Sequence, residues 1–299
     1  MSFLNKIKNR TMWVASSCVS MFYKVFYKKP IVKNIEETIL ELVNSNRSIA
    51  RYGDGELDLI MGGDINFQKN DIRLVQKLKD ILLLEDEYFM VGIPDTFDSL
   101  SMYNAPARRY YGNYLRNYRG HWYKNLNRKD KIYYCAGMTR PYMDLEDKTP
   151  SKKYFNLLKQ IWKNKKVVII EGEKSRLGIG NDLFDGCIEI KRVLCPATNS
   201  FYVYEDILKE VKKFDKDYMI LLALGPTATA LAYDIYKMGY RALDIGHVDI
   251  EYEWFKMGAT TKVPVKNKYT NEAESIGGLD VGESNDKIYK SQIFSKIGC

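Results

Sequence analysis

Three short apolar runs decide the fold: "KKVVIIEG" (165–172), "YMILLALG" (218–225) and "YRALDIG" (240–246). Each run ends in glycine, and none of them alternates between apolar and polar residues. Continuous apolar runs are typical of strands that are buried on both faces, as in a parallel sheet. Helical patterns at about 199–214 and 226–238 separate the three runs. The order of strands and helices predicts α/β architecture with a mostly parallel sheet.

The chain upstream of these runs also alternates between helical and extended patterns. A helix is expected after a capping asparagine, with four apolar side chains on one face: Asn34, then Ile35, Ile39, Leu42 and Val43. A second helix is expected at roughly 70–84. Three stretches are expected to be strands, the last of them after a loop rich in Tyr and Arg: "SIARY" (48–52), "YFMVGIP" (88–94) and "KIYYCAGM" (131–138). No internal repeat or Pro- or Ser-rich linker divides the body, so we expect one α/β domain with helices flanking its sheet.

The net charge of +8 is concentrated at the start of the chain. The first 33 residues hold seven Lys or Arg and no acid, which leaves 39 of the 46 basic residues against 38 acidic residues in the remainder. A nucleic-acid-binding domain needs a basic patch on its folded surface. The nearly neutral body therefore argues against a nucleic-acid partner.

The basic arm, residues 1–33, has a helical apolar pattern. Apolar residues recur at three- and four-residue steps, with aromatic residues beside them: Leu4, Ile7, Val14, Cys18, Met21 and Val25. The uncharged run from Thr11 to Tyr23 is too short to cross a hydrocarbon core, which needs about 20 apolar residues. We expect a basic amphipathic helix on an anionic inner leaflet. A helix that docks on the domain, or a weak signal peptide, would show the same pattern.

The five cysteines suggest a reduced compartment. Their number is odd and no C-x-x-C pair occurs among them: Cys18, Cys135, Cys187, Cys195 and Cys299. Disulfides are rare in the cytoplasm. With the basic arm, this predicts a cytoplasmic protein that lies peripherally on the inner face of the membrane.

Two loops after predicted strands have features of anion sites, because ligands of parallel sheets bind beyond the carboxyl ends of the strands. "EGEKSRLGIGNDLF" (171–184) offers three glycines together with Lys174 and Arg176, yet it matches neither the dinucleotide nor the phosphate-loop fingerprint. "GPTATALAYDIY" (225–236) places Thr227 and Thr229 at a helix start that could hold a phosphate. A plain surface loop and an ordinary capped helix are the alternatives.

Two further strand ends have acidic residues. "GHVDIEYEWF" (246–255) alternates His247, Asp249, Glu251 and Glu253 with apolar residues, so an extended segment would place all four on one side. A solvated edge strand would look the same. "RYGDGELDLI" (51–60) holds two carboxylates one glycine apart, Asp54 and Glu56. They form either a tight turn or an oxygen-ligand site for magnesium or manganese.

Seven segments in this order resemble bacterial glycosyltransferases of the GT-D fold type. They are "RYGDGE" (51–56), "TRPY" (139–142), "EGEKSRLGIGNDLF" (171–184), "LCP" (194–196), "ALGPTATALAYD" (223–234), "DIGHVDIEYEWF" (244–255) and "KY-x-NE" (268–272). The resemblance covers roughly Arg47 to Glu272. It implies a glycosyltransferase domain over residues 34–272, between the arm and a C-terminal tail (273–299).

The resemblance further implies a Rossmann-like core that transfers a hexose from a nucleotide-sugar, typically a UDP-sugar, to a glycan, glycoprotein or lipid-linked acceptor in surface polysaccharide or glycoprotein synthesis. It assigns a divalent metal, Mn²⁺ or Mg²⁺, to Asp54 and Glu56. For "RYGDGELDLI" it therefore favours the metal site over the tight turn. Catalytic candidates are these two residues with His247, Asp249 and Glu251 as possible bases. Donor-binding candidates are Arg51, Glu171, Lys174, Ser175, Arg176, Gly178, Asn181, Asp182 and Thr227.

Other interpretations stay open at this stage. The Tyr- and Arg-rich stretch 108–123 could face an acceptor, act as a lid or form a packed loop. A nucleotidyltransferase, a nucleotide-sugar hydrolase or a non-catalytic nucleotide-binding subunit could share the same core.

Overall fold

A computed structural model describes residues 3–126, 130–270 and 281–298. In these residues one nine-stranded sheet forms the centre of the molecule, in the order β1-β4-β3-β2-β8-β7-β5-β6-β9. All its strand pairings are parallel. The strands are β1 (Ile31–Val32), β2 (Ser48–Arg51), β3 (Phe89–Ile93), β4 (Ile132–Cys135), β5 (Lys166–Gly172), β6 (Glu189–Cys195), β7 (Tyr218–Ala223), β8 (Ala242–Asp244) and β9 (Ile293–Lys296).

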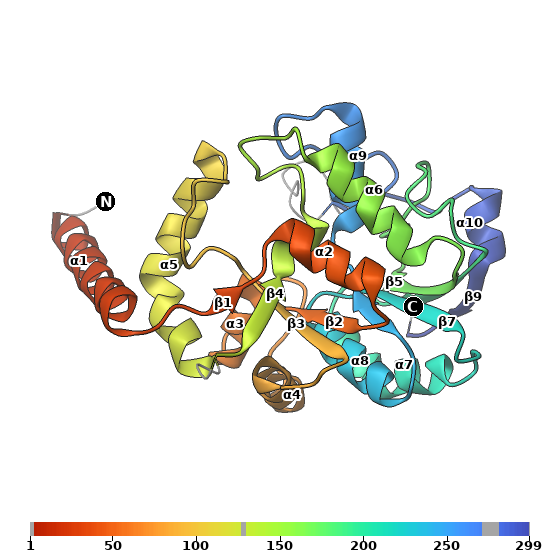
Figure 1. Ribbon diagram of the computed structural model, residues 1–299, viewed down its shortest axis with the longest axis horizontal. Coiled ribbons are helices and arrows are strands. Elements are labelled where there is room, and N and C mark those ends of the chain that lie inside the picture. Colours follow the sequence, from red (N-terminus) through yellow and green to blue (C-terminus); the bar gives the residue numbers. More distant parts are fainter. Residues whose placement is uncertain (1–2, 127–129, 271–280, 299) are drawn as a thin grey trace.

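Helices cover both faces of this sheet (Figure 1). One face packs against α2 (Ile35–Asn44), α6 (Ser151–Trp162) and α9 (Val248–Met257). The other packs against α3 (Asp54–Ile60), α4 (Ile72–Leu83), α7 (Tyr204–Val211) and α8 (Pro226–Lys237). The remaining helices are α1 (Phe3–Phe26), α5 (Ala105–Asn125) and α10 (Lys287–Gln292), with short 3₁₀ turns η1 (Ala136–Thr139) and η2 (Ser200–Val203). The predicted α/β fold with flanking helices is confirmed.

The central strands have no polar face because both of their faces are buried. In β5, Val168 and Ile170 enter the core beneath α8, whereas Val167 and Ile169 enter the core beneath α6. All four side chains are completely buried. This explains the continuous apolar runs, since each alternate residue needs an apolar environment.

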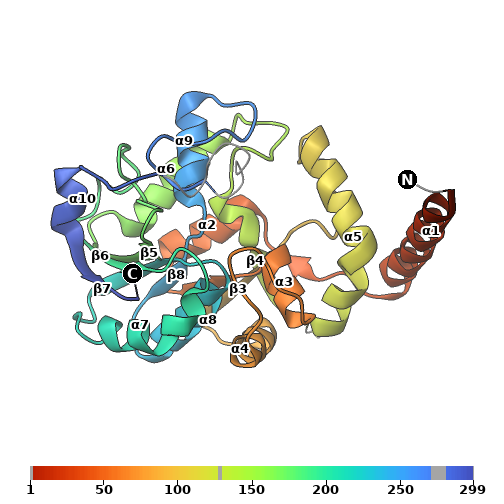
Figure 2. The ribbon, with the colours of Figure 1, turned by 180° about the vertical axis from the view of Figure 1, so that it is seen from behind.

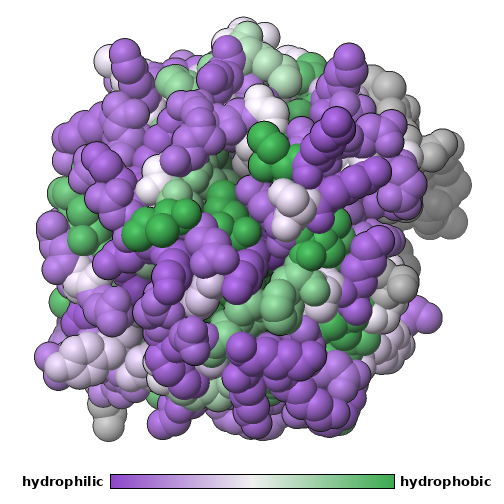
Figure 3. Space-filling view, turned by 90° about the vertical axis from the view of Figure 1, so that its right-hand side faces the viewer, coloured by the Kyte–Doolittle hydropathy of each residue, from purple (hydrophilic) through white to green (hydrophobic). Residues whose placement is uncertain are grey.

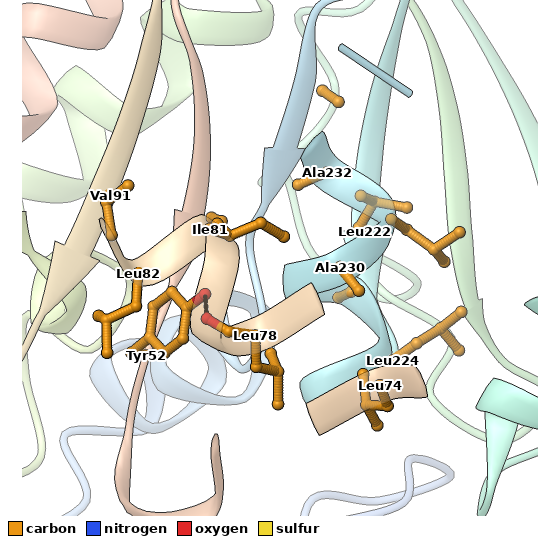
Figure 4. Close-up of a cluster of buried hydrophobic side chains, with 14 of the residues drawn as sticks. Tyr52, Leu74, Leu78, Ile81, Leu82, Val91, Leu222, Leu224, Ala230 and Ala232 are labelled. Carbon is orange, nitrogen blue, oxygen red and sulfur yellow. Dashed lines mark hydrogen bonds between the residues drawn. The ribbon is translucent and has the colours of Figure 1, made fainter. Parts of the chain in front are cut away.

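The core between α4 and α8 shows how closely these layers approach (Figure 4). Leu74 and Leu78 of α4 lie beside the small residue Ala230 of α8, and all three are fully buried. The buried hydroxyl of Tyr52 donates a hydrogen bond of 2.7 Å to the Leu78 carbonyl. This bond satisfies the phenol and fixes the chain immediately after β2, where the candidate metal ligands follow.

Local signals predicted several elements correctly. Asn34 caps α2 in a capping box with Glu37, whose carboxylate accepts the Asn34 N–H at 2.9 Å. The predicted strands at 48–52, 88–94 and 131–138 appear as β2, β3 and β4. The helix at 70–84 is α4, and the helix at 226–238 is α8. The pattern at 199–214 corresponds to η2 followed by α7.

The prediction of a loop over 108–123 was wrong, because this stretch lies inside α5. The helix begins after Asn104, whose side chain accepts the Ala107 N–H at 3.0 Å, with Pro106 in its first turn. Tyr110, Tyr114 and Tyr118 follow at four-residue spacing, so their rings share one helical face. The aromatic content therefore reflects a helix face.

The ends of the chain contribute to the sheet. In the arm, β1 pairs with β4, and in the expected tail, β9 pairs with β6. The strand β6 has a half-exposed first part and was not predicted as an element. The face of the molecule that carries α10 and β9 is mostly hydrophilic, with small separated apolar areas (Figure 3). Among the described helices, none has the length and hydropathy needed to span a bilayer.

Candidate active site

A cavity of about 870 Å³ opens at the carboxyl edge of the sheet. Residues at or just after the ends of seven strands line it: Arg51 (β2), Pro94 (β3), Ala136 (β4), Gly172 (β5), Ala197 (β6), Ala223 (β7) and Asp244 (β8). This is the edge at which parallel α/β sheets bind ligands.

The cavity separates the candidate residues into two groups. Six of them line it: Arg51, Asp54, Glu56, Ser175, His247 and Asp249. The other eight are not among its lining residues: Glu171, Lys174, Arg176, Gly178, Asn181, Asp182, Thr227 and Glu251. The hydrogen bonds of most of this second group show that they hold the walls of the cavity in place.

Arg51 and Asp244 form the floor between β2 and β8. The guanidinium of Arg51 bonds the Asp244 carboxylate at 2.9 Å, the Asp244 carbonyl at 2.8 Å and the Ala136 carbonyl at 3.1 Å. Burial raises the pKa of Asp244, and the charge of Arg51 opposes that shift. Gly246 has φ +42°, and a Cβ there would lie 2.0 Å from the guanidinium. Only glycine therefore fits beside Arg51.

Asp54 and Glu56 occupy the first turn of α3. The Glu56 carboxylate folds back and accepts the Gly53 N–H at 2.7 Å, as in a capping box. Asp54 accepts a hydrogen bond from the hydroxyl of Tyr110. Burial, opposed by the Gly53 amide and reinforced by the Asp244 and Asp54 carboxylates, raises the pKa of Glu56 to about 7. Both acids therefore sit at a helix start and face the same cavity.

The glycine-rich segment 171–184 is anchored from behind. Glu171 and Arg192 form a fully buried ion pair of 2.5 Å, and the second oxygen of Glu171 accepts the Leu177 N–H at 2.7 Å. Arg176 is also buried, and its guanidinium donates to the carbonyls of Asn267, Val281 and Gly282. Glu171 and Arg176 thus bind protein groups rather than the cavity.

Asp249 ties this segment to α9. One carboxylate oxygen accepts the Gly178 N–H and the Asn181 amide, both at 2.8 Å, and the other accepts Lys268 at 2.7 Å. Glu253 accepts the same Lys268 at 2.8 Å. Asp249 and Lys268 are almost completely buried, so this network is shielded from water.

The segment 246–255 is not extended, so its period-two pattern does not place the four polar side chains on one side: residues from Val248 onward form α9. On a helix, residues four apart share a face and residues two apart do not. Asp249 and Glu253 accordingly bind Lys268 together, whereas Glu251 points elsewhere and accepts the Met143 N–H at 3.0 Å. Glu251 is fully buried. His247 precedes the helix and lines the cavity.

Three more donor-binding candidates outside the cavity lining bond to protein groups. Asp182 accepts from Lys159, Tyr252 and Lys256, and chiefly its bond to Lys159 lowers its pKa. The buried hydroxyl of Thr227 lies 3.2 Å from the side-chain oxygen of Gln68. The backbone carbonyl of Lys174 accepts the Tyr269 N–H at 2.9 Å.

Another wall of the cavity is aromatic. The sequence analysis offered the stretch 108–123 as one that could face an acceptor, but it named no tyrosine as a site residue. We define the tyrosine wall as Tyr103, Tyr110, Tyr111 and Tyr114, all of which line the cavity. The ring centres of Tyr103 and Tyr111 are 4.7 Å apart, and those of Tyr110 and Tyr111 are 5.3 Å apart. The hydroxyl of Tyr103 donates to Asp95. The four-residue spacing of Tyr110 and Tyr114 was the available signal for this wall.

Comparison with known proteins agrees with this geometry. The family model described as the glycosyltransferase GT-D fold matches residues 49–273. A solved glycosyltransferase from Streptococcus sanguinis is 41% identical with a TM-score of 0.85, covering 90% of this chain and 100% of that chain. A second solved structure, described as having a distinct glycosyltransferase fold, is 38% identical with a TM-score of 0.86, covering 96% and 100% of the two chains.

Two curated relatives are considerably longer than this chain. The probable glycosyl transferase Gly of Streptococcus gordonii is 40% identical over 267 residues, which are 89% of this chain and 39% of that protein. Glycosyltransferase GlyD of Streptococcus pneumoniae serotype 4 is 39% identical over 279 residues, or 92% and 34% of the two chains. The chain thus spans less than half of either relative. These matches, the parallel sheet and the cavity at its carboxyl edge confirm the resemblance: the chain belongs to the glycosyltransferases of the GT-D fold.

Proposed function

We propose that this glycosyltransferase moves a hexose from a UDP-sugar to a glycan, glycoprotein or lipid-linked acceptor during assembly of surface polysaccharides or glycoproteins. The observation that supports it is the placement of Asp54 and Glu56 at the start of α3, inside the cavity at the carboxyl edge of the sheet. Such an edge suits a nucleotide, and a pair of carboxylates suits the metal ion of a diphosphate. The same proposal places the enzyme on the inner face of the membrane, with no nucleic-acid partner.

The charge of the cavity fits a divalent ion. Eight carboxylates line it against three cationic side chains, Arg51, Arg140 and Lys262. An anionic diphosphate would be repelled by this excess of acid unless a cation accompanied it. Among the described residues, no group of three or more His, Cys, Asp or Glu side chains is arranged around one metal position. Magnesium and manganese often bind through one or two carboxylates, with phosphates and water completing the shell.

Within this proposal Asp54 and Glu56 would hold Mn²⁺ or Mg²⁺. A bound divalent ion would stabilise the negative charge that develops on the leaving diphosphate. Arg51 bonds Asp244 and the Ala136 carbonyl, so it keeps β2, β4 and β8 in register beneath the donor. Gly225, the residue before α8, lines the same cavity, and the N–H groups at the start of a helix favour anions. Glu171, Arg176 and Asp249 position the glycine loop rather than bind the donor.

His247 is the candidate base that the geometry favours for an inverting transfer. Asp249 already accepts three hydrogen bonds, one of them from the buried ammonium of Lys268. Glu251 lies outside the cavity lining and accepts a backbone amide. A base must reach the acceptor hydroxyl within hydrogen-bond distance, and of the three only His247 and Asp249 line the cavity.

A screen of nucleotide-sugars for turnover, with and without manganese, tests the proposal. We expect UDP-sugar turnover that requires the ion, and Asp54→Asn and Glu56→Gln should abolish it with the melting curve preserved. Calorimetry should show UDP binding at least tenfold weaker in excess chelator. Full activity in chelator, or in either variant, would contradict the metal site. Product analysis separates the alternatives, because a hydrolase reaches full turnover without acceptor and a non-catalytic subunit binds UDP without turnover.

A further inference from the structure

Helix α1 packs against α5 through its more polar face. The Ser20 hydroxyl donates to the Leu115 carbonyl at 3.0 Å and accepts from Arg119 at 3.2 Å. The ring of Tyr23 lies over Gly120, where an added Cβ would be only 2.7 Å from the ring. Figures 1 and 2 both show α1 at one end of the molecule, beside α5 and away from the sheet. The serine and tyrosine side of α1 is therefore the side that meets the protein.

The opposite face of α1 is apolar and exposed. Val14 is 48% exposed, Met21 62%, Val25 62% and Phe26 72%. Val14, Cys18, Met21 and Val25 follow three- and four-residue steps, so they form one stripe along the helix. A helix that merely covers a domain turns its apolar stripe inward. Here the stripe points outward, which indicates a second binding partner for this face.

The charge of the arm identifies the partner. Seven Lys or Arg and no acid occur in the first 33 residues. Lys28 and Lys29 pair with Asp130 and Asp98 at the exposed surface, where such pairs are weak, and Lys24 is exposed. A second copy of this helix would bring like charges together. An anionic lipid surface accepts both the cations and the apolar stripe.

We propose that the outward face of α1 docks the enzyme on anionic membranes, while its inward face stays bound to α5. The proposal goes beyond the transfer reaction and does not depend on it. It also unites two of the three sequence-based interpretations of the arm, since one helix both docks on the domain and binds the bilayer surface.

Co-sedimentation with vesicles tests the proposal directly. The full chain is mixed with vesicles of phosphatidylglycerol and phosphatidylcholine, or of phosphatidylcholine alone, at 50 and 500 mM salt. We expect binding to the anionic vesicles that is at least tenfold stronger than to the neutral ones, and that weakens with salt without vanishing. A chain that stays in the supernatant with anionic vesicles at low salt would overturn the proposal.

Matched variants separate this face from the rest of the surface. Met21→Glu with Val25→Glu should weaken vesicle binding at least tenfold and leave the melting curve unchanged, because both side chains are exposed. Ile188→Glu with Ile288→Glu is the control, since these side chains are 67% and 66% exposed and Ile288 lies on α10 at the far end of the molecule. The control should bind within twofold of the parent. Equal binding by the two double variants would refute the assignment.

Cys18 offers a direct report of insertion. It is exposed on the outward stripe, whereas Cys135 and Cys195 are buried. In a variant with Cys187 and Cys299 replaced by serine, an environment-sensitive fluorophore on Cys18 should shift to the blue with anionic vesicles. No shift would overturn the proposal, as would a dimer in light scattering that the Met21 and Val25 changes convert to monomer. UDP binding by the same samples shows whether the proposed function holds independently.

Discussion

Replacing Arg192 by methionine tests whether the buried ion pair holds the glycine-rich segment. Arg192 bonds Glu171 at 2.5 Å, and the two side chains are only 1% and 0% exposed. Removal of one partner from such a pair leaves an unpaired buried charge and costs about 3–5 kcal/mol. Arg192 also donates to the Leu177 carbonyl and the Gln292 side chain, both at 2.8 Å. We therefore expect a loss of unfolding free energy in the upper part of that range at pH 8.

The loss of unfolding free energy should depend on pH, in a direction that follows from the pKa of Glu171. Burial already raises the pKa of Glu171, and the charge of Arg192 is the main influence that lowers it. Without Arg192 the folded-state pKa rises further above the unfolded value. The folded variant then binds more protons than the unfolded chain, so its stability increases as the pH falls. Each pH unit contributes at most about 1.4 kcal/mol, so between pH 8 and pH 5 the deficit can shrink by at most about 4 kcal/mol.

Glu171→Gln and the double variant complete a double-mutant cycle with Arg192→Met. In Glu171→Gln the buried guanidinium cannot release its proton, so the deficit should be similar at pH 5 and pH 8. The double variant Glu171→Gln with Arg192→Met buries no charge and should recover most of the loss, to within about 2 kcal/mol of the parent. Urea unfolding at three pH values measures all four proteins. The reasoning fails if the Arg192 variant loses less than about 1 kcal/mol, or if its deficit does not change with pH.

Three further predictions concern the walls of the cavity. Gly246→Ala should lose about 2 kcal/mol or more in urea unfolding, because the new Cβ meets Arg51, whereas Gly180→Ala, also at a positive φ but in open space, should lose about 1 kcal/mol. Lys268→Met should lose about 3 kcal/mol of unfolding free energy and weaken UDP binding in calorimetry, because it leaves two carboxylates beside the glycine loop without their cation. Unchanged UDP affinity would show that this loop is not part of the donor site. Tyr111→Ala should raise the KM for acceptor about tenfold, and Tyr111→Phe should restore it, if the tyrosine wall holds the acceptor by its rings.

The strands of this fold were predictable because burial on both faces leaves a simple record in the sequence. The middle of β5, Val167 to Ile170, and the whole of β7 are apolar without alternation, as expected for strands covered by helices on both faces. β6 was missed because its first residues are half-exposed and charged. The pattern at 246–255 is ambiguous in itself, because acids at every second position fit a strand face, yet Asp249 and Glu253 also fit one helix face at four-residue spacing.

The candidate site was predictable only as a set of loops. Glycines and charges after strands mark the carboxyl edge, but the sequence does not say which side chains turn toward the cavity. Arg51 and Asp244 illustrate the difficulty, because they are 193 residues apart and meet only when β2 and β8 become neighbours. Three of the four residues of the tyrosine wall lie on α5, so that wall depends in the same way on α5 being a helix.

The division between cavity-lining and anchoring residues follows from the chemistry of the glycine loop. A loop that leaves its backbone free to approach a diphosphate has few side chains of its own to hold its shape. Its rigidity must then come from charged groups behind it, where burial makes each ion pair and amide contact strong. Glu171 with Arg192, and Asp249 with Lys268, supply that support from two sides. Their carboxylates already accept hydrogen bonds from the loop amides of Leu177 and Gly178, which fits the proposal that Asp54 and Glu56 of α3, and not these anchoring acids, would hold a metal ion.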